Sequence, residues 1–241
     1  MQCVILAGGL ATRLGRVAAS VPKTLVPVGG RPFAEHQLGW LAANGVTDLV
    51  YCIGHLGEQV RGFVGDGAPW GLRVRYVDEG DRRLGTAGAL RLAHDEGALA
   101  EQFAVVYGDS YLPIDLPPVW EDFERRRPDA LMTVFRNDGR FDRSNARLRA
   151  DGLVEYDKEA TGAARAAMRH IDYGLSVIDR DRVVGELIPG APADLADVFR
   201  SLSRAGRLAG HEVGKRFYEI GSLEGLDELD ALLTRRQPVA G

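Results

Sequence analysis

The segment CVILAGG at residues 3–9 decides the fold that we expect. A short apolar run leads directly into two glycines, which is the pattern of a strand buried on both faces that ends in a tight backbone turn. Similar β-type runs recur along the chain and alternate with segments of helical periodicity. We expect further strands at 49–53, 74–77, 103–107, 131–135 and 175–178, and helices around 33–43, 57–64, 86–95 and 118–126.

This alternation predicts an α/β fold, with a Rossmann-like, mostly parallel but mixed sheet flanked by helices. Ligands of such sheets bind beyond the carboxyl ends of the strands, so we expect chemically active residues there. In the second half, the β-type segments 146–148 and 153–156 flank Asp151-Gly152, which predicts an antiparallel hairpin. A one-sided leucine stripe after Ser222 predicts a C-terminal helix at 222–236.

Composition excludes several classes of protein. Of the 241 residues, 45% are hydrophobic and 27% are charged, as in an ordinary folded domain. The 30 basic and 34 acidic residues give a net charge of −4, so no global basic field favours nucleic acid or a membrane surface. Cys3 and Cys52 lie in apolar runs, which fits buried thiols in a reducing compartment. We expect a soluble cytoplasmic protein, because the N-terminal apolar run is too short for a signal peptide.

The first candidate for chemistry is the turn after the first strand. Gly8 and Gly9 allow backbone N–H groups to approach an anion closely, and Arg13 adds a charged group. This order of residues is neither the dinucleotide fingerprint nor a P-loop. Ten residues later, Lys23 lies in the proline-stiffened segment PKTLVPVGGRP at 22–32, and it is one of only three lysines. Arg13 and Lys23 together predict recognition of a polyphosphate.

Two carboxylates could serve such a phosphate site. Asp109 follows Gly108 just beyond the strand at 103–107, and Glu219 precedes Gly221. Mg²⁺ binds proteins through one or two carboxylates together with substrate phosphates, so these two residues predict an Mg²⁺ site. Taken singly, Asp109 is also explained as a turn cap, and Glu219 as an exposed strand carboxylate.

Six ordered segments carry a resemblance to a known family. They are LAGGLATRL at 6–14, PKTLVPVGGRP at 22–32, LGTAGAL at 84–90, YGDS at 107–110, EYDKE at 155–159 and FYEIGS at 217–222. Together they resemble the sugar-1-phosphate nucleotidylyltransferases, and among these the short single-domain members such as heptose-1-phosphate guanylyltransferases. The resemblance implies Mg²⁺-dependent transfer of a nucleoside monophosphate from a nucleoside triphosphate, GTP by the form of LGTAGAL, to a heptose or hexose 1-phosphate.

The resemblance also implies a role for each matching residue. The nucleoside would be held by Leu6, Ala7, Gly8, Gly9, Gly85 and Thr86. The reacting phosphates and the metal would be held by Arg13, Lys23, Asp109 and Glu219, of which the first three are the catalytic candidates. The sugar phosphate would be held by Gly108, Asp157, Lys158 and Gly174. Four residues depart from the usual family pattern: Ala11, Arg16, Asp157 and Glu219.

The same resemblance implies one domain over 1–241. Its nucleotide-binding part covers about 1–115, its sugar-phosphate part about 116–222, and the C-terminal helix follows. Two alternatives stay open: a catalytically silent sensor of nucleotides or sugar phosphates on the same fold, and a nucleotidylyltransferase with a non-sugar acceptor. An oxidoreductase is disfavoured because the glycine order and the ribose-binding acid of that class are missing. No oligomeric state is predicted.

Overall fold

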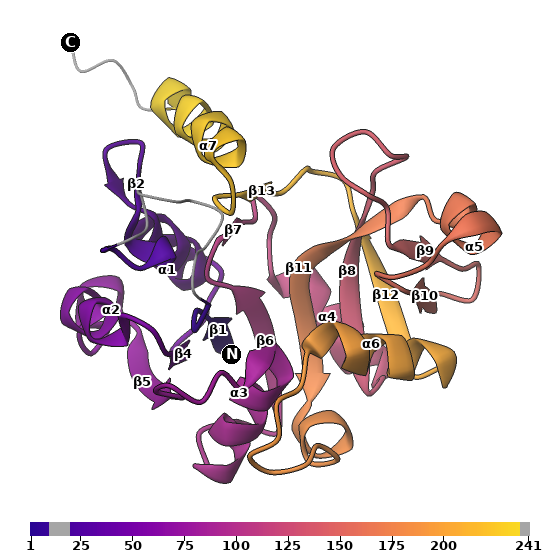
Figure 1. Cartoon of the computed structure of the whole chain (residues 1–241), viewed down its shortest axis with the longest axis horizontal. Helices are drawn as coiled ribbons and strands as arrows, with labels where there is room; N and C mark the ends of the chain where they lie inside the picture. Colours follow the sequence, from indigo (N-terminus) through magenta and orange to yellow (C-terminus); the bar gives the residue numbers. More distant parts are fainter. Residues whose placement is uncertain (10–19, 237–241) are drawn as a thin grey trace.

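A mixed sheet forms the centre of the fold (Figure 1). The computed structural model of the chain describes residues 1–9 and 20–236. Within these residues the sheet has nine strands in the order β10-β9-β11-β6-β1-β4-β5, with β8 paired to β11 and β12 paired to β8. The strands are β1 (Gln2–Leu6), β4 (Asp48–Ile53), β5 (Arg73–Asp78), β6 (Gln102–Tyr107), β8 (Ala130–Arg136), β9 (Ala146–Leu148), β10 (Val154–Tyr156), β11 (His170–Asp179) and β12 (Leu208–Val213).

The first half of this sheet is parallel and the second half is mixed. β1 pairs in parallel with both β4 and β6, and β4 pairs in parallel with β5. β11 then runs antiparallel to β6 and β8, whereas β12 is parallel to β8. The predicted fold class and the six predicted long strands are therefore confirmed.

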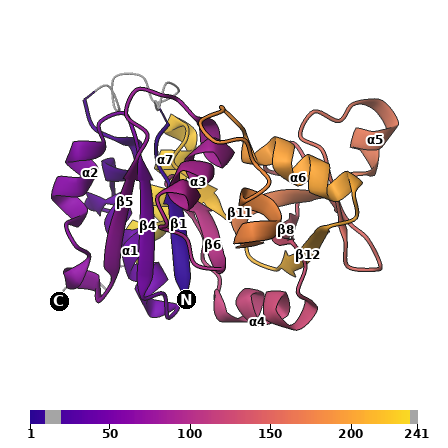
Figure 2. The same ribbon diagram turned by 90° about the horizontal axis from the view of Figure 1, so that it is seen from below.

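Helices cover both faces of the sheet. They are α1 (Phe33–Ala43), α2 (Gly57–Val64), α3 (Gly85–Asp95), α4 (Pro117–Arg126), α5 (Gly162–Ala167), α6 (Leu195–Arg204) and α7 (Leu223–Arg236). Alternate residues of β1 enter two different core clusters: Cys3 and Ile5 pack with α1, α2 and α4, while Val4 and Leu6 pack with α3 and α6. Figure 2 shows α4 and α6 on opposite sides of the strands of the second half. This alternation confirms that β1 is buried on both faces.

Two local predictions are also confirmed. β9 and β10 form an antiparallel hairpin, in which Gly152 has a φ of +79° and Asp151 Oδ1 accepts the Leu153 N–H at 3.1 Å. At the C-terminal helix, Ser222 Oγ accepts the Gly225 N–H at 3.1 Å. Both cysteines are free and buried. Within the described residues, no helix combines the length and the hydrophobicity needed to cross a membrane.

Short elements shape the edge of the sheet where strands β1 and β6 end. They are the 3₁₀ helix η2 (Lys23–Leu25) and the strands β2 (Pro27–Val28), β3 (Arg31–Pro32), β7 (Ser110–Tyr111) and β13 (Tyr218–Glu219). β2 pairs with β3, and β13 pairs with β7. α7 packs against this region through a small core cluster of its own, with Leu229 and Leu233 against Val28, Phe33 and Ile220. The C-terminal part of the chain therefore returns to the segment that carries Lys23.

Candidate active site

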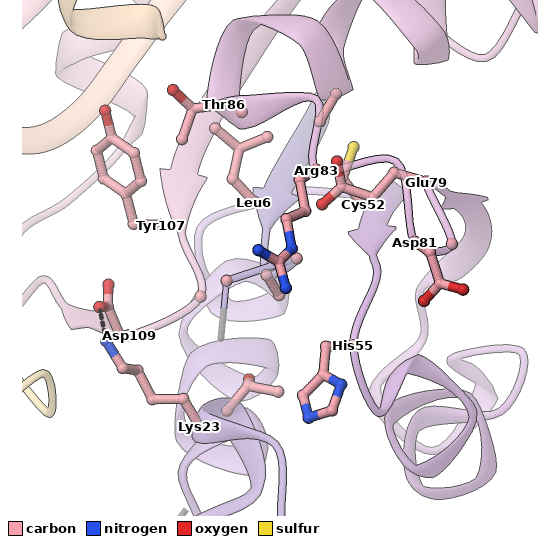
Figure 3. Close-up of a pocket in the computed structure, with 18 residues that line it drawn as sticks. Leu6, Lys23, Cys52, His55, Glu79, Asp81, Arg83, Thr86, Tyr107 and Asp109 are labelled. Atoms are coloured by element: carbon pink, nitrogen blue, oxygen red, sulfur yellow. Dashed lines mark hydrogen bonds and ion pairs between the residues drawn. The ribbon is translucent and has the colours of Figure 1, made fainter. Parts of the chain in front are cut away.

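A cleft of about 710 Å³ opens at the carboxyl ends of β1, β4, β5 and β6 (Figure 3). It is lined by nine residues that were predicted from the sequence: Leu6, Ala7, Gly8, Gly9, Lys23, Gly85, Thr86, Gly108 and Asp109. Figure 3 places Lys23 and Asp109 at one end of the cleft and Glu79 and Cys52 toward the other. Arg13 lies outside the described residues, as do Ala11 and Arg16.

Lys23 and Asp109 form the polar centre of one end. Lys23 Nζ lies 2.7 Å from Asp109 Oδ2, and about a quarter of each side chain is exposed. Lys23 enters the cleft from η2, which is closed by the Val26 N–H donating to Lys23 O at 3.1 Å. Asp109 enters from the turn after β6, where the Gly108 N–H donates to Leu6 O at 2.9 Å. An ammonium from η2 and a carboxylate from the turn after β6 are thereby presented together.

Gly108 allows this turn to approach the first strand closely. A Cβ at this position would lie 2.8 Å from Ala7 Cβ, closer than side chains pack. Gly108 therefore contributes a close backbone approach between the loops that follow β1 and β6.

Glu219 is brought beside Asp109 by the β13–β7 pair. In that pair Glu219 lies opposite Ser110, and the Ile220 N–H donates to Asp109 O at 3.0 Å. The Glu219 side chain reaches solvent, yet desolvation by surrounding protein atoms, with the nearby Asp109 carboxylate, raises its pKa to about 7. The positive charge of Lys23 opposes this shift. The two predicted carboxylates therefore lie close enough to repel each other.

This donor set fits a hard divalent cation. Carboxylate oxygens are the ligands that Mg²⁺ prefers, and a cation between Asp109 and Glu219 would relieve their repulsion. Within residues 1–9 and 20–236, no group of three or more His, Cys, Asp or Glu side chains is arranged to hold a metal ion. Two carboxylates together with substrate phosphates match the way in which Mg²⁺ is usually held.

Glu79 was not predicted from the sequence, and it lies at the opposite end of the cleft. The side chain is 8% exposed, and Oε2 accepts the Leu84 N–H at 2.8 Å. A Cβ on Gly8 would collide with Glu79 Oε1, whereas a Cβ on Gly9 would meet no atom of residues 1–9 or 20–236 within 4 Å. Gly8 is therefore required by the packing of a buried carboxylate. The signal in the sequence was an acidic residue directly after β5.

Thr86 lines the cleft, but its hydroxyl is engaged by α6. Thr86 Oγ1 donates to Asp194 Oδ1 at 3.0 Å and accepts the Leu195 N–H at 2.7 Å. The Ala87 and Gly88 N–H groups both donate to Ala193 O. The start of α3 is thus bonded to the segment that leads into α6, and the Thr86 hydroxyl fixes this contact.

The predicted sugar-phosphate residues, apart from Gly108, lie outside the lining of the cleft. Asp157 pairs with two arginines of α6, at 3.7 Å from Arg200 Nη1 and 3.6 Å from Arg204 Nη2. Gly174 has a φ of +86° and adjoins the turn of Asp109, since a Cβ there would lie 3.4 Å from Ser110 Oγ.

Asp172 joins this group and was also not predicted. It accepts the Gly174 N–H at 3.0 Å through Oδ1. Burial raises the pKa of the Asp172 carboxyl to about 6, and the charge of Lys158 opposes that rise. Gly174 therefore joins Asp172 to the turn of Asp109, and the charge of Lys158 acts on the Asp172 carboxyl.

Comparison with known proteins decides the family. Residues 3–220 match the family model of the MobA-like NTP transferase domain. The chain belongs to this family. A CMP-5'-(3-aminopropyl)phosphonate synthase from Streptomyces rubellomurinus is 46% identical over 77 residues, which are 32% of this chain and 12% of that protein. A mannose-1-phosphate guanylyltransferase from Mycobacterium tuberculosis is 31% identical over 137 residues, which are 56% of this chain and 37% of that protein.

Solved structures agree on the fold of this MobA-like transferase. A Bacillus anthracis protein, solved with sucrose as a candidate glucose-1-phosphate thymidylyltransferase, superposes with a TM-score of 0.81. The two chains share 23% identity, over 100% of this chain and 98% of the other. The predicted family and the predicted fold are therefore confirmed. The roles of individual site residues stay predictions.

Proposed function

We propose that this MobA-like transferase moves a nucleoside monophosphate from a nucleoside triphosphate, with GTP preferred, to a heptose or hexose 1-phosphate. The products would be pyrophosphate and a nucleoside diphosphate sugar, made in the cytoplasm. The observation that carries the proposal is the pairing of Lys23 with Asp109, beside Glu219, at the strand ends of a 710 Å³ cleft. The similar mannose-1-phosphate guanylyltransferase supports both the reaction type and GTP.

The proposed reaction is a direct displacement. An oxygen of the acceptor phosphate attacks the α-phosphorus, a new P–O bond forms, and the bond to the bridging oxygen of pyrophosphate breaks. A phosphate monoester is already anionic at neutral pH, so the reaction needs no strong base. The barrier comes from bringing two anions together and from the charge that develops at the α-phosphoryl group. A covalent enzyme intermediate is not required.

Each candidate side chain has a defined part in this proposal. Lys23 places a positive charge beside the α-phosphate, and Arg13 binds the β- and γ-phosphates. Asp109 and Glu219 would hold Mg²⁺, which when bound reduces the repulsion between the two substrates. Lys23 also restrains the Asp109 carboxylate through the 2.7 Å contact.

The two ends of the cleft separate the parts of the nucleotide. The nucleoside is bound by the backbone of residues 6–9 and by Gly85 and Thr86, beside the buried Glu79 carboxylate. The acceptor phosphate approaches from the side of Gly108 and Gly174, where Lys158 supplies a positive charge and Asp157 orders the loop through its pairs with α6.

A non-sugar acceptor is the second candidate. The Streptomyces rubellomurinus relative, 46% identical over its matched stretch, is named for an aminopropyl phosphonate. The chain covers only 12% of that protein and 37% of the guanylyltransferase, so the acceptor has to be tested directly.

The test is a panel assay of pyrophosphate release with Mg²⁺. GTP, UTP, dTTP, ATP and CTP are each combined with heptose, mannose, glucose, N-acetylglucosamine and muramate 1-phosphates and with 3-aminopropylphosphonate. Turnover of GTP with a sugar 1-phosphate supports the proposal, and turnover with the phosphonate alone supports the second candidate. Nucleotide binding without turnover in any combination favours a silent sensor.

A further inference from the structure

Helix α1 holds the segment after β6 through three polar side chains on one face. Gln37 Nε2 donates to Tyr107 O at 2.8 Å and to Ser110 O at 3.2 Å. Trp40 Nε1 donates to Ile114 O at 2.8 Å, and Asn44 Oδ1 accepts the Leu116 N–H at 2.7 Å. Positions 37, 40 and 44 lie on one face of a helix, so α1 binds residues 107–116 along their length.

Gln37 differs from the other two because its bonds bracket the turn of Asp109. Tyr107 is the last residue of β6 and Ser110 is the first residue of β7. One side-chain amide, 2% exposed, thus joins the carbonyl groups on both sides of Gly108 and Asp109. The turn therefore cannot open without breaking at least one of these buried bonds.

The orientation of this amide leaves one atom unsatisfied. Gln37 Oε1 is buried and has no hydrogen-bond partner within the described part of the chain. Flipping the Gln37 side-chain amide would point Oε1 at the Tyr107 and Ser110 carbonyl oxygens, and both hydrogen bonds would be lost. The observed orientation is therefore the one that these two carbonyl groups require. A buried unpaired acceptor is unfavourable, and natural proteins retain such atoms where they serve another purpose.

The same end of α1 also holds the segment that follows Lys23. His36 Nε2 donates to Val28 O at 2.8 Å, and the Phe33 N–H donates to Val26 O at 3.0 Å. Adjacent residues of one helix therefore bind the two segments whose side chains meet in the Lys23–Asp109 contact. A rigid helix is a precise support for such a constellation.

We propose that Gln37 is a positioning residue, which sets the place of Asp109 relative to Lys23 by clamping the turn at Tyr107 and Ser110. This inference rests on the proposed function, because it assigns Gln37 a part in the same transfer reaction. It does not require Gln37 to touch a substrate.

The test compares Gln37→Met with Trp40→Phe. Met approximates the volume of Gln without the amide, while Phe removes the Trp40 bond to Ile114 on the same helix and the same segment, outside the turn. Hydrogen exchange followed by mass spectrometry shows whether each variant has loosened residues 107–116, and this readout does not depend on enzymatic activity. The rate of pyrophosphate release gives kcat, KM and the Mg²⁺ concentration for half-maximal rate.

We expect Gln37→Met to speed exchange at residues 107–111, to lower kcat roughly tenfold or more, and to raise the Mg²⁺ requirement, with KM for the nucleotide little changed. Trp40→Phe should speed exchange only near residue 114 and keep the wild-type kcat.

If Gln37→Met showed the wild-type exchange rate at residues 107–111, or the wild-type kcat, the inference would be overturned. Should Gln37→Met not fold, Gln37→Asn replaces it, since its shorter amide cannot reach both carbonyls and should give the same changes to a smaller degree. A wild-type protein without turnover would instead overturn the proposed function.

Discussion

At the scale of single residues, Gly8 shows how a glycine can serve a neighbour rather than a turn. Its φ is not in the left-handed region, so conformational freedom does not explain it. The space of its missing Cβ is occupied by the carboxylate of Glu79, which is buried and bonded to the Leu84 N–H. The glycine and the acid therefore depend on each other.

Gly8→Ala should therefore lower the free energy of unfolding, whereas Gly9→Ala should leave it nearly unchanged. The added methyl group would displace the Glu79 carboxylate from its bond to Leu84, with an expected loss of about 1–2 kcal/mol in the free energy of unfolding. Gly9→Ala adds the same methyl group where no atom of the described residues lies within 4 Å. Urea unfolding of both variants measures the difference, and equal stabilities would show that Glu79 is free to move.

Glu219 predicts a pH dependence of cation binding. Its pKa of about 7 in the folded protein exceeds the ordinary value of 4.5, so the folded chain retains a proton that the unfolded chain loses. The stability linked to Glu219 is therefore complete below about pH 4.5 and is lost as the pH rises toward 7. Binding of Mg²⁺ needs the ionised carboxylate, so it should strengthen as the pH rises through about 7.

Glu219→Gln should remove that dependence. We expect the Mg²⁺ affinity of the nucleotide-bound wild type to increase between about pH 6 and about pH 8, and that of the variant to be weak and nearly flat. The control is Glu155→Gln, which neutralises an exposed carboxylate on β10. A pH dependence that survives in Glu219→Gln would remove this residue from the metal site. Calorimetric titration provides the measurement.

The residue scale also shows which site residues the sequence can disclose. Lys23, Gly108 and Asp109 were predictable because their segments directly follow strands or lie in proline-stiffened loops, where position alone indicates a role. Glu79 and Asp172 were missed because their environments come from distant residues. Asp172 is an ordinary strand residue until folding buries its carboxyl group and brings the charge of Lys158 to act on it.

At the scale of elements, α6 links the second half of the chain to the start of α3, where Thr86 lines the cleft. It begins at Leu195, and the preceding Asp194 caps it by accepting the Ala196 N–H at 3.0 Å. The same Asp194 carboxylate accepts the hydroxyl of Thr86 at the start of α3. One carboxylate therefore caps one helix and fixes the position of another.

Thr86→Val should weaken this junction while keeping the shape of the side chain. The change leaves the Leu195 N–H without its acceptor, so we expect a loss of about 1–2 kcal/mol in the free energy of unfolding. Thr161→Val is the matched control, because Thr161 precedes α5 without a side-chain cap bond. Denaturant unfolding measures both, and an equal loss in the two variants would contradict the assigned role of the Thr86 hydroxyl.

Elements were predicted best where their periodicity is simple. Strands β1, β4 and β6 of the parallel half contain continuous apolar runs, and the four helices expected between strands were found at the expected places. α6 and β12 were not predicted. β12 carries Gly210 and His211 in its middle, which weakens a strand pattern, and a Cβ at Gly210 would meet Val154 and Leu148 of the neighbouring hairpin. Its glycine is explained only by that tertiary contact.

At the scale of the whole molecule, one sheet joins the two halves of the described chain. β11 pairs antiparallel with β6, whose carboxyl end leads into the turn of Asp109. The C-terminal part returns through β13, which sets Glu219 beside that turn. Residues from three distant parts of the sequence are thereby gathered around the Lys23–Asp109 contact. This convergence is the structural basis of the proposed transfer reaction.

The most direct test of this account is the rate of pyrophosphate release by Lys23→Ala, with the most active nucleotide and acceptor of the panel and Mg²⁺. In the proposed reaction Lys23 contributes the positive charge beside the α-phosphate, so its removal should lower kcat by roughly 10²-fold, as the loss of one transition-state donor does. Lys215→Ala, which removes an exposed lysine away from the cleft, should keep the wild-type rate. A Lys23→Ala variant with the wild-type kcat would contradict the account.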